Sequence, residues 1–458
     1  MPNYDAIIVG TGQSGPALAR RLVAAGGKVA IVERKLFGGT CVNTGCTPTK
    51  TLAASAHVAH VARRAADYGV MIGGTVNVDM KAVKARKDAV VAVFRNGVEQ
   101  SLKTLQGCTV YEGHGRFVAE KKVAVNGSEL TADQIFINVG ARAAIPPIPG
   151  LDQVPYLTNS SMMDIDVLPA HLVILGGSYI GLEFAQVYRR FGSEVTVIEF
   201  GPRLISREDE DVSQAVAGFL KEEGIDVRVN SEVVGVEKQG NSIVAKVEST
   251  GRVSQIAGTH LLVATGRRPN TDDLGLDKAG IGTNARGYIL VDDQLRTNIS
   301  SIWAMGDCNG QGAFTHTSWN DFEIVAANLL DKDQRRVSDR ITAYALYTDP
   351  PLGRAGMTEA EVRKMGKSAL ISTMAMKDVM RAYERGETKG FMKILVDRDN
   401  KQILGASFLG LEGDEVIHCV LDIMYAKAPY TVIQRAMHIH PTVSEFIPTM
   451  MDKLKPLQ

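Results

Sequence analysis

The feature that most constrains the fold is a segment that occurs twice. In each copy an apolar run leads into a glycine-rich turn, a helix-like stretch and a second apolar run that ends in an acid, from Ala6 to Glu33 and from Leu172 to Glu199. The acid follows the first glycine, Gly10 or Gly176, by 23 residues in both copies. A glycine turn between a strand and a helix, with an acid about 20 residues on, is typical of dinucleotide binding. The repeat predicts an α/β protein with two dinucleotide-binding, Rossmann-like domains.

The chemistry of dinucleotide binding explains the residue types in these turns. Glycine lets the backbone approach a pyrophosphate, the helix N-terminus offers N–H groups, and the acid accepts a hydrogen bond from a ribose hydroxyl. We expect Glu33 and Glu199 to be the ribose acceptors. Ser178 replaces the middle glycine of the second copy, which is tolerated if its backbone angles are ordinary. The glycines assigned to the two cofactor sites are Gly10, Gly12 and Gly15 in the first copy and Gly176 and Gly181 in the second.

Composition and charge exclude several other classes of protein. Lys plus Arg and Asp plus Glu both number 51, so the net charge is zero and favours neither nucleic acid nor an anionic membrane as a partner. Five cysteines in 458 residues are too few for a disulfide-stapled secreted protein. We find no secretion-signal pattern and no apolar run of about 18 residues, and we therefore expect a cytoplasmic protein.

Two cysteines stand five residues apart just after the first copy. Cys41 and Cys46 are close enough to bridge in a turn or a distorted helix if their Cβ atoms converge. A reduced pair supplies a thiolate, whose pKa falls near positive charge or a helix N-terminus. Lys50 follows Cys46 by four residues, one helical turn along the same face. Three further cysteines have no partner at a useful spacing and are expected to fill the core: Cys108, Cys308 and Cys419.

The order of these motifs resembles that of the class I pyridine nucleotide-disulfide oxidoreductases, which include glutathione reductase, lipoamide dehydrogenase and mercuric reductase. The likeness covers essentially the whole chain, including the turns at 264–270 and 302–307 and the ending His440–Glu445. It implies FAD at the first copy, NAD(P)H at the second, and hydride transfer through the flavin to a Cys41–Cys46 disulfide. The implied divisions are an FAD-binding domain at 1–150 and 269–338, an NAD(P)H-binding domain at 151–268 and an α+β dimerisation domain at 339–458.

The same resemblance implies roles for single residues. Cys46 would face the flavin and Cys41 would exchange with the substrate. Lys50 would lie at the flavin's reactive nitrogen, paired with Glu183. A helix starting near residue 315 would aim its N–H groups at the flavin's carbonyl edge. Further cofactor contacts are expected from Gly39, Thr40, Gly140, Gly266, Thr315 and Asp307, the last through the ribityl chain of FAD.

The acid and base are expected near the C-terminus. His440 precedes Pro441, and Glu445 could orient its ring by accepting from the second nitrogen. The resemblance implies that His440 serves the cysteine pair of the opposite subunit, which predicts an obligate homodimer with shared active sites. We expect no metal site, and we read His57 and His60 as an exposed helix face.

Residue 199 bears on the choice of nicotinamide cofactor. A carboxylate there accepts from a free 2′-hydroxyl and repels a 2′-phosphate, so NADH is favoured over NADPH, although Arg203 could admit NADPH. Within the family the chain resembles the reactive-chlorine-resistance flavoproteins, a mercuric-reductase-like branch associated with copper(II) reduction. The shared stretches are Cys46–Leu52, Ile302–Asp307 and Pro350–Glu359. The expected electron acceptor is a small disulfide or a soft metal ion such as Cu(II).

Other hypotheses remain open. A lipoamide dehydrogenase, the flavoprotein component of a 2-oxo acid dehydrogenase complex, fits His440 and Glu199, but the residues at 47–52 depart from its usual pattern. A mercuric reductase-like enzyme would lack the usual terminal cysteine pair, since 451–458 contains none. The arginines expected of glutathione reductase cannot be identified. A non-enzymatic sensor that binds a partner according to the state of its cysteine pair is the hypothesis from another class.

Overall fold

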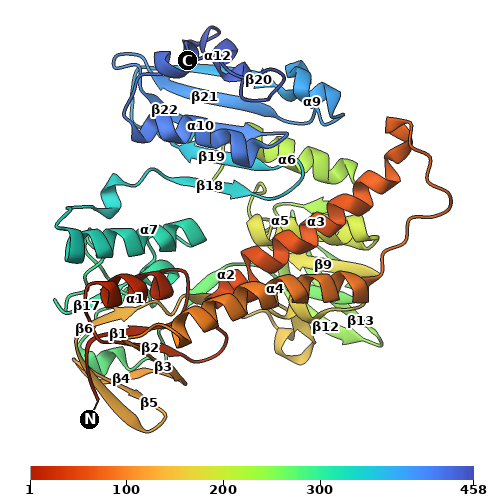
Figure 1. Ribbon diagram of the computed structural model, residues 1–458. Coiled ribbons are helices and arrows are strands. Elements are labelled where there is room, and N and C mark those ends of the chain that lie inside the picture. Colours follow the sequence, from red (N-terminus) through yellow and green to blue (C-terminus); the bar gives the residue numbers. More distant parts are fainter. Residues whose placement is uncertain (1, 458) are drawn as a thin grey trace.

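The two repeated segments fold into equivalent units. The computed structural model describes residues 2–457 (Figure 1). The two copies form β1 (Asn3–Val9), α1 (Ser14–Ala24) and β2 (Val29–Glu33), and β9 (His171–Leu175), α5 (Tyr179–Phe191) and β10 (Glu194–Ile198). The two strands of each copy pair in parallel. A parallel pair joined through a helix is a βαβ unit, so the predicted fold class is confirmed.

The first unit is part of a seven-stranded sheet. Its order is β3-β2-β1-β6-β5-β4, with β17 pairing in parallel with the other side of β6. The added strands are β3 (Cys108–Glu112), β4 (Arg116–Ala119), β5 (Lys122–Val125), β6 (Ser128–Ile137) and β17 (Ile302–Ala304). Because β17 lies more than 160 residues after β6, the chain leaves this sheet, builds the second unit and then returns.

The second unit is part of a five-stranded sheet in the order β11-β10-β9-β15-β8. Its further strands are β8 (Tyr156–Leu157), β11 (Asp226–Arg228) and β15 (His260–Val263). A separate antiparallel sheet consists of β12 (Glu232–Gln239), β13 (Ser242–Ser249) and β14 (Arg252–Gly258), and a two-stranded link of β7 (Ala141–Ala143) and β16 (Arg267–Pro269). This link joins the segments that enter and leave the second unit.

The C-terminal part is built on an antiparallel sheet, drawn in blue above the two units in Figure 1. Its order is β18 (Ala343–Leu346), β19 (Leu352–Gly356), β22 (Ile403–Leu409), β21 (Phe391–Asp397), β20 (Ala369–Ala375) and β23 (Lys455–Pro456). The remaining helices are α2 (Gly39–Thr44), α3 (Cys46–Arg63), α4 (Met80–Lys103), α6 (Glu210–Glu222), α7 (Thr315–Ala326), α8 (Glu359–Lys364), α9 (Met380–Glu384), α10 (Gly413–Tyr425), α11 (Thr431–Gln434) and α12 (Phe446–Met451). No helix within residues 2–457 is long and apolar enough to span a bilayer.

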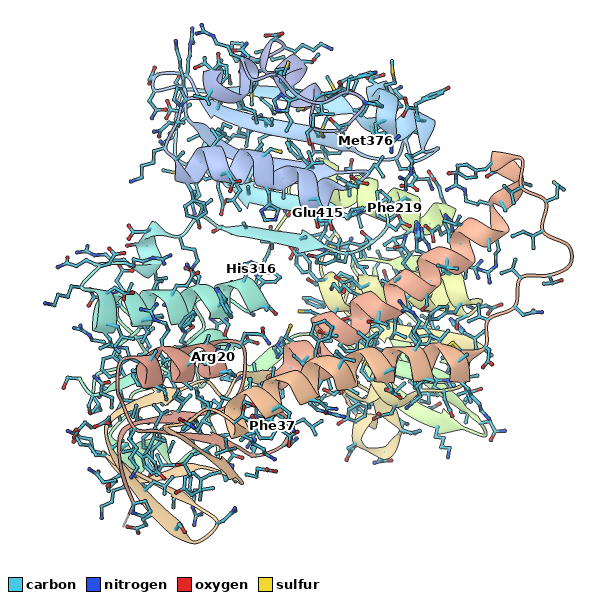
Figure 2. The ribbon with its side chains drawn as sticks, viewed as in Figure 1. Arg20, Phe37, Phe219, His316, Met376 and Glu415 are labelled. Carbon is cyan, nitrogen blue, oxygen red and sulfur yellow. The ribbon has the colours of Figure 1, made fainter. Side chains whose placement is uncertain are left out.

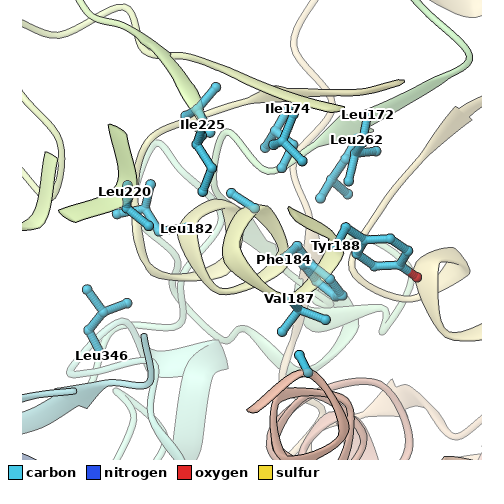
Figure 3. Packing of buried hydrophobic residues seen from close by; sticks show 14 of the residues in the cluster. Leu172, Ile174, Leu182, Phe184, Val187, Tyr188, Leu220, Ile225, Leu262 and Leu346 are labelled. Carbon is cyan, nitrogen blue, oxygen red and sulfur yellow. The ribbon is translucent and has the colours of Figure 1, made fainter. Parts of the chain in front are cut away.

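One large apolar core surrounds α5 (Figure 3). Leu182 and Tyr188 of this helix are buried with Leu172 and Leu262 of the sheet against which it packs. Leu346 of β18 reaches the same cluster from the C-terminal part. The helix α3 packs against both α4 and α5. The start of α3, the helix α5 and the end of β18 are therefore held together by a shared core.

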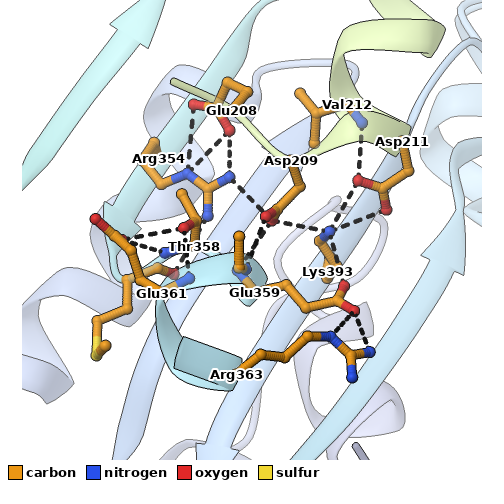
Figure 4. Close-up of polar contacts among 12 residues, drawn as sticks. Glu208, Asp209, Asp211, Val212, Arg354, Thr358, Glu359, Glu361, Arg363 and Lys393 are labelled. Carbon is orange, nitrogen blue, oxygen red and sulfur yellow. Dashed lines mark hydrogen bonds and ion pairs between the residues drawn. The ribbon is translucent and has the colours of Figure 1, made fainter. Parts of the chain in front are cut away.

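A buried group of charges also joins the second unit to the C-terminal part (Figure 4). Arg354 of β19 forms an ion pair with Glu208, and both side chains are almost fully buried. Lys393 of β21 contacts Asp209 at 3.0 Å and Asp211 at 2.9 Å. Since a buried charge is costly unless it is paired, these contacts favour one orientation of the C-terminal sheet on the second unit.

Candidate functional site

A single large cavity of about 1760 Å³ gathers most of the predicted flavin and cysteine residues. Figure 2 labels His316, at the start of α7, which lines this cavity. The predicted residues that line it are Gly10, Gly12, Glu33, Gly39, Thr40, Cys41, Cys46, Lys50, Gly140, Glu183, Asp307 and Thr315. The predicted residues outside its lining are Gly15, Gly176, Gly181, Glu199, Gly266, His440 and Glu445.

The first glycine turn lies tightly against residue 138. A Cβ on Gly10, where φ is +108°, would overlap the carbonyl oxygen of Asn138, and one on Gly12 would lie 2.8 Å from the side-chain oxygen of that residue. The N–H and hydroxyl of Thr11 donate to Glu33 Oε2 at 3.0 and 2.6 Å. Sequence reasoning missed Thr11 and Asn138, because their contacts span 22 and more than 120 residues of chain.

The second glycine turn repeats the carboxylate contacts in a simpler form. The N–H groups of Gly177 and Gly201 donate to the two oxygens of Glu199, at 2.6 and 2.7 Å. Ser178 is exposed and has φ −111° and ψ −173°, which is the ordinary backbone that the sequence required of it. Both acids therefore shape their own turns, and each retains lone pairs for a ribose hydroxyl.

The cysteine pair joins two helices. Cys41 lies in α2, Cys46 begins α3, and Gly45 separates the helices with φ −130° and ψ −120°. Both cysteines are thiols in this structure, and the two side chains are hydrogen-bonded to each other. That hydrogen bond, with smaller contributions from Thr315 and Lys50, lowers the pKa of Cys46 to about 6 although burial opposes the shift. The same hydrogen bond and burial raise the pKa of Cys41.

The start of α7 faces the thiol of Cys46. Thr315 is the first residue of α7, and its hydroxyl lies 3.2 Å from Cys46 Sγ. No side chain caps this helix at Phe314, so its first N–H groups are available to an anion. A thiolate and a helix N-terminus are complementary in charge, which agrees with the lowered pKa of Cys46.

Lys50 and Glu183 meet although 133 residues separate them. Lys50 Nζ, one turn along α3 from Cys46, donates to Glu183 Oε2 at 2.7 Å, and the Glu183 side chain is only 10% exposed. The structure therefore brings together the two residues that the family resemblance paired. Tyr347, which sequence reasoning did not single out, contacts both of them.

Asp307 forms an ion pair inside the cavity. Its Oδ2 lies 3.2 Å from a guanidinium nitrogen of Arg267, a contact that the sequence analysis did not anticipate. Burial raises the pKa of Asp307, and Arg267 opposes that rise. The Nε atom of Arg267 is buried without a hydrogen-bond partner among residues 2–457, so this side chain retains a donor for a ligand.

The His440–Glu445 pair lies at the surface of the chain. His440 Nδ1 is 3.0 Å from Glu445 Oε2, and the histidine side chain is 65% exposed. The neighbouring Met437 and Ile439 are also exposed, at 100% and 80%. The two residues thus lie together as the sequence predicted, but neither lines the cavity of its own chain.

The reading of His57 and His60 as an exposed helix face is wrong. Both are partly buried, and His57 Nδ1 lies 2.8 Å from Asp349 Oδ2. Asp349 raises the pKa of His57, whereas burial and Arg190 lower that of His60 to about 4. The described residues contain no group of three or more histidine, cysteine or acidic side chains arranged to hold a metal ion.

The residues of the cavity fit FAD. The glycine backbone at Gly10 and Gly12 approaches too closely to residue 138 for any side chain, and no side chain caps α1 at Gln13. An uncapped helix N-terminus behind a glycine turn suits a pyrophosphate. Arg267 supplies a buried donor without a partner among residues 2–457. Gly12, Glu33 and Arg267 would hold such a cofactor with its reactive end near Cys46.

Family models identify the class of protein. Residues 4–321 match the pyridine nucleotide-disulphide oxidoreductase family, and residues 342–451 match the dimerisation domain of the same family. The chain therefore belongs to this family, as the motif order predicted. It is an NAD(P)H-dependent flavoprotein disulfide oxidoreductase with the Cys41–Cys46 redox pair, and its family uses FAD and NAD(P)H.

Individual relatives show which members of the family the chain is similar to. The chain is 35% identical to the probable pyridine nucleotide-disulfide oxidoreductase RclA of Escherichia coli, covering 99% of this chain and all of the relative. It is 32% identical to a mercuric reductase of Bacillus cereus, covering 95% of this chain and 71% of the relative. A solved structure of the Cu(II) complex of the HOCl-induced flavoprotein disulfide reductase RclA from Escherichia coli matches with a TM-score of 0.89 and 34% identity, covering 98% of this chain and 99% of that one.

Proposed function

We propose that the protein passes electrons from NADH to a small disulfide or a soft metal ion such as Cu(II), through bound FAD and the Cys41–Cys46 pair. The observation that carries this proposal is the position of Cys46, whose sulfur lies 3.2 Å from the hydroxyl of Thr315 at the start of α7 and whose pKa is lowered by Cys41, Thr315 and Lys50. Bound FAD would take hydride from the nicotinamide and deliver two electrons to the disulfide. One NADH then balances one substrate disulfide reduced to two thiols, or two Cu(II) reduced to two Cu(I).

The two thiols have different tasks in this proposal. Cys46 stays ionised near neutral pH because Cys41 donates to it and Lys50 lies nearby. Cys41, whose pKa is raised, must lose its proton before it attacks a substrate disulfide or binds a metal ion. Thiolates are soft ligands, which suits a soft metal ion. The Cu(II) complex of the Escherichia coli relative supports the metal-ion alternative.

The proton acceptor for Cys41 would come from a second copy of the chain. His440, held by Glu445, is the predicted base, yet neither residue lines the cavity of its own chain. The dimerisation domain and the exposed Met437 and Ile439 support a homodimer in which each subunit lends its His440 to the other. Glu199 supports the preference for NADH, because its carboxylate repels a 2′-phosphate.

Steady-state turnover tests the proposal. The purified holoenzyme is given NADH or NADPH with a panel of acceptors: oxidised glutathione, lipoamide, cystine, Cu(II) and Hg(II). We expect NADH-driven reduction of Cu(II) or one small disulfide, lost in Cys41→Ser and Cys46→Ser. Lipoamide turnover above all other acceptors would instead identify a lipoamide dehydrogenase, and turnover no faster than that of free flavin would refute the proposal.

A further inference from the structure

We infer that Tyr347 is a positioning residue for Lys50, whose ammonium group its aromatic ring holds against Glu183. The inference rests on the proposed function, since the role of Lys50 at the flavin belongs to that proposal. Tyr347 follows directly after β18, in the C-terminal part of the chain, and lines the same cavity as Cys46 and Lys50.

The ammonium of Lys50 lies between a carboxylate and an aromatic face. Its Nζ is 2.7 Å from Glu183 Oε2 and 4.3 Å from the centroid of the Tyr347 ring. A cation within about 6 Å of a ring centroid is attracted by the ring's quadrupole. The Lys50 side chain is 33% exposed, and the ring covers part of its ammonium group. The hydrogen bond to Glu183 fixes the position of the Lys50 ammonium group, and the Tyr347 ring limits the directions in which this group can move.

Tyr347 also contacts the other member of the pair. Its backbone N–H donates to Glu183 Oε1 at 3.1 Å, leaving Oε2 for Lys50. One residue therefore orients the carboxylate with its backbone and the ammonium with its side chain. Lys50 belongs to α3 and Glu183 to α5, whereas Tyr347 comes from the C-terminal part, more than 160 residues after Glu183. The pair is complete only when all three segments are assembled.

The backbone around Tyr347 is anchored, which fixes the ring over Lys50. The N–H of Asp349 donates to Gln186 Oε1 at 2.8 Å, and the Asp349 carboxylate pairs with Arg190 at 2.5 Å. Gln186 and Arg190 lie on α5, the helix that carries Glu183. The segment is thus attached to α5 at several points within three residues. Without such anchors, the entropy cost of ordering the side chain would exceed the free energy gained from the contact between the ring and the ammonium group.

The hydroxyl of Tyr347 is not part of this arrangement. The side chain is 41% exposed, and no hydrogen bond to its hydroxyl is found within residues 2–457. Burial, together with the negative charges of Asp414 and Cys46, raises the pKa of the phenol, so the ring stays neutral. The ring and not the hydroxyl therefore positions Lys50, so we expect phenylalanine at residue 347 to preserve this role and an aliphatic side chain to lose it.

Turnover by the holoenzyme gives the first readout. We expect Tyr347→Leu to lower kcat with NADH about fivefold and to leave the KM for NADH unchanged. The variant loses one cation–π contact to Lys50, and that contact acts on electron transfer and not on the binding of NADH. Tyr347→Phe should stay within about twofold of the wild type. The matched control is Tyr68→Leu, whose ring lies 5.9 Å from Arg64 Cζ outside the cavity and which should leave kcat unchanged.

Alkylation of Cys46 gives a readout that needs no turnover. Reduced protein is treated with iodoacetamide across a pH series, and the Cys46 peptide is quantified by mass spectrometry. Tyr347→Leu and Tyr347→Met expose Lys50 to water and screen its charge, so alkylation at pH 6 should fall about twofold or threefold, while Tyr347→Phe matches the wild type. Two non-aromatic variants are used so that the test can still be made if one of them fails to fold.

The two readouts separate the inference from the proposed function. If wild-type protein does not oxidise NADH, the proposed function fails and the alkylation series still decides the inference. Alkylation profiles of Tyr347→Leu and Tyr347→Met that coincide with the wild type would overturn the inference, whatever the turnover. An equal loss in Tyr347→Phe and Tyr347→Leu would also overturn it, since the hydroxyl would then be the active group.

Discussion

The first and second glycine units share their pattern but differ in enclosure. In both, the acid at the strand end accepts the N–H of the residue after the first glycine, from Thr11 to Glu33 and from Gly177 to Glu199. In the first unit Thr11 is fully buried and adds its hydroxyl to that contact. The second has no side chain there, and its acid lies outside the large cavity. The same local pattern thus builds a turn that lines the large cavity, here called the closed turn, and a turn at residues 176–178 that lies outside its lining, here called the open turn.

We propose that this difference reflects two cofactors that stay bound for different lengths of time. A cofactor that stays bound gains from a turn inside a large cavity, because each contact that excludes water slows its release. A cofactor that is exchanged in every turnover needs an approachable turn such as the one at Ser178, which is exposed. The location of the first turn within the large cavity supports the proposal that FAD binds to the first unit.

Exchanging the middle residues of the two turns should give the largest effect. In Gly12→Ser the new Cβ would lie 2.8 Å from the Asn138 side-chain oxygen, which also accepts the N–H of Gly15. We expect the FAD dissociation constant to rise at least about tenfold. Ser178→Gly should change the KM for NADH less than about twofold, because Ser178 has an extended backbone and its side chain makes no capping hydrogen bond to α5. Flavin absorbance per chain and steady-state kinetics measure the two. Equal losses would remove the distinction between the units.

Neutralising each acid should separate the two cofactors. Glu199→Gln removes an acceptor from the open turn, so we expect kcat/KM for NADH to fall about tenfold, about 1.4 kcal/mol, with the flavin content unchanged. Glu33→Gln should lower the flavin content and leave the KM for NADH of the remaining holoenzyme unchanged. The kcat/KM ratio of NADH to NADPH is measured in parallel. A ratio that stays constant in Glu199→Gln would contradict the assignment of that residue.

The closed unit is also the side that carries the reactive thiol, which gives a pH prediction. Cys46 has its pKa lowered to about 6, while that of Cys41 is raised. Only the thiolate is alkylated, so labelling of Cys46 should rise as the pH increases through about 6 and level off above it. Cys41 should remain unlabelled over this range. Thr315→Val removes a hydroxyl that lowers the pKa of Cys46 and should shift the rise to higher pH. Preferential labelling of Cys41 would be inconsistent with the proposed division of tasks.

The smallest expected effect concerns the cations beside the two acids. Arg34, next to Glu33, is paired with Asp273 at 2.8 Å. Arg203, near Glu199, donates from a terminal nitrogen to the carbonyl oxygen of Ser206, and its Nε is buried without a partner within residues 2–457. We expect Arg203→Ala to lower the NADPH-to-NADH ratio of kcat/KM about threefold, whereas Arg34→Ala leaves it unchanged. A ratio that moves equally in both variants would show that Arg203 does not face the 2′ position.

Local patterns made much of the fold predictable. The glycine turns, their acids and the cysteine pair lie within single segments of about 30 residues, where strand and helix periods and glycine spacing carry the information. The family resemblance added the pairing of Lys50 with Glu183 and the start of α7 near Thr315. The return of β17 to the first sheet agrees with the proposed division of the FAD-binding domain, whose limits stay a prediction.

The contacts that sequence reasoning missed are those between distant segments. Thr315 meets Cys46 across 269 residues, and Tyr347 meets Glu183 across 164. The periodicity of one segment carries no information about such a contact, because the contact depends on how the two glycine units and the C-terminal part pack together. His57 was misread for the same reason, since its partner Asp349 is 292 residues away. The position of His440 relative to a partner's cysteines depends on assembly as well.

An anaerobic titration of the holoenzyme with NADH, recorded in the visible spectrum, tests the central claim most directly. We predict a long-wavelength charge-transfer band between the Cys46 thiolate and the flavin, because Cys46 is the ionised member of the pair and lies in the flavin cavity. The band should be absent in Cys46→Ser and weaker below about pH 6. Simple bleaching of the flavin in the wild type would contradict the account, since electrons would then stop at the flavin without reaching the cysteine pair.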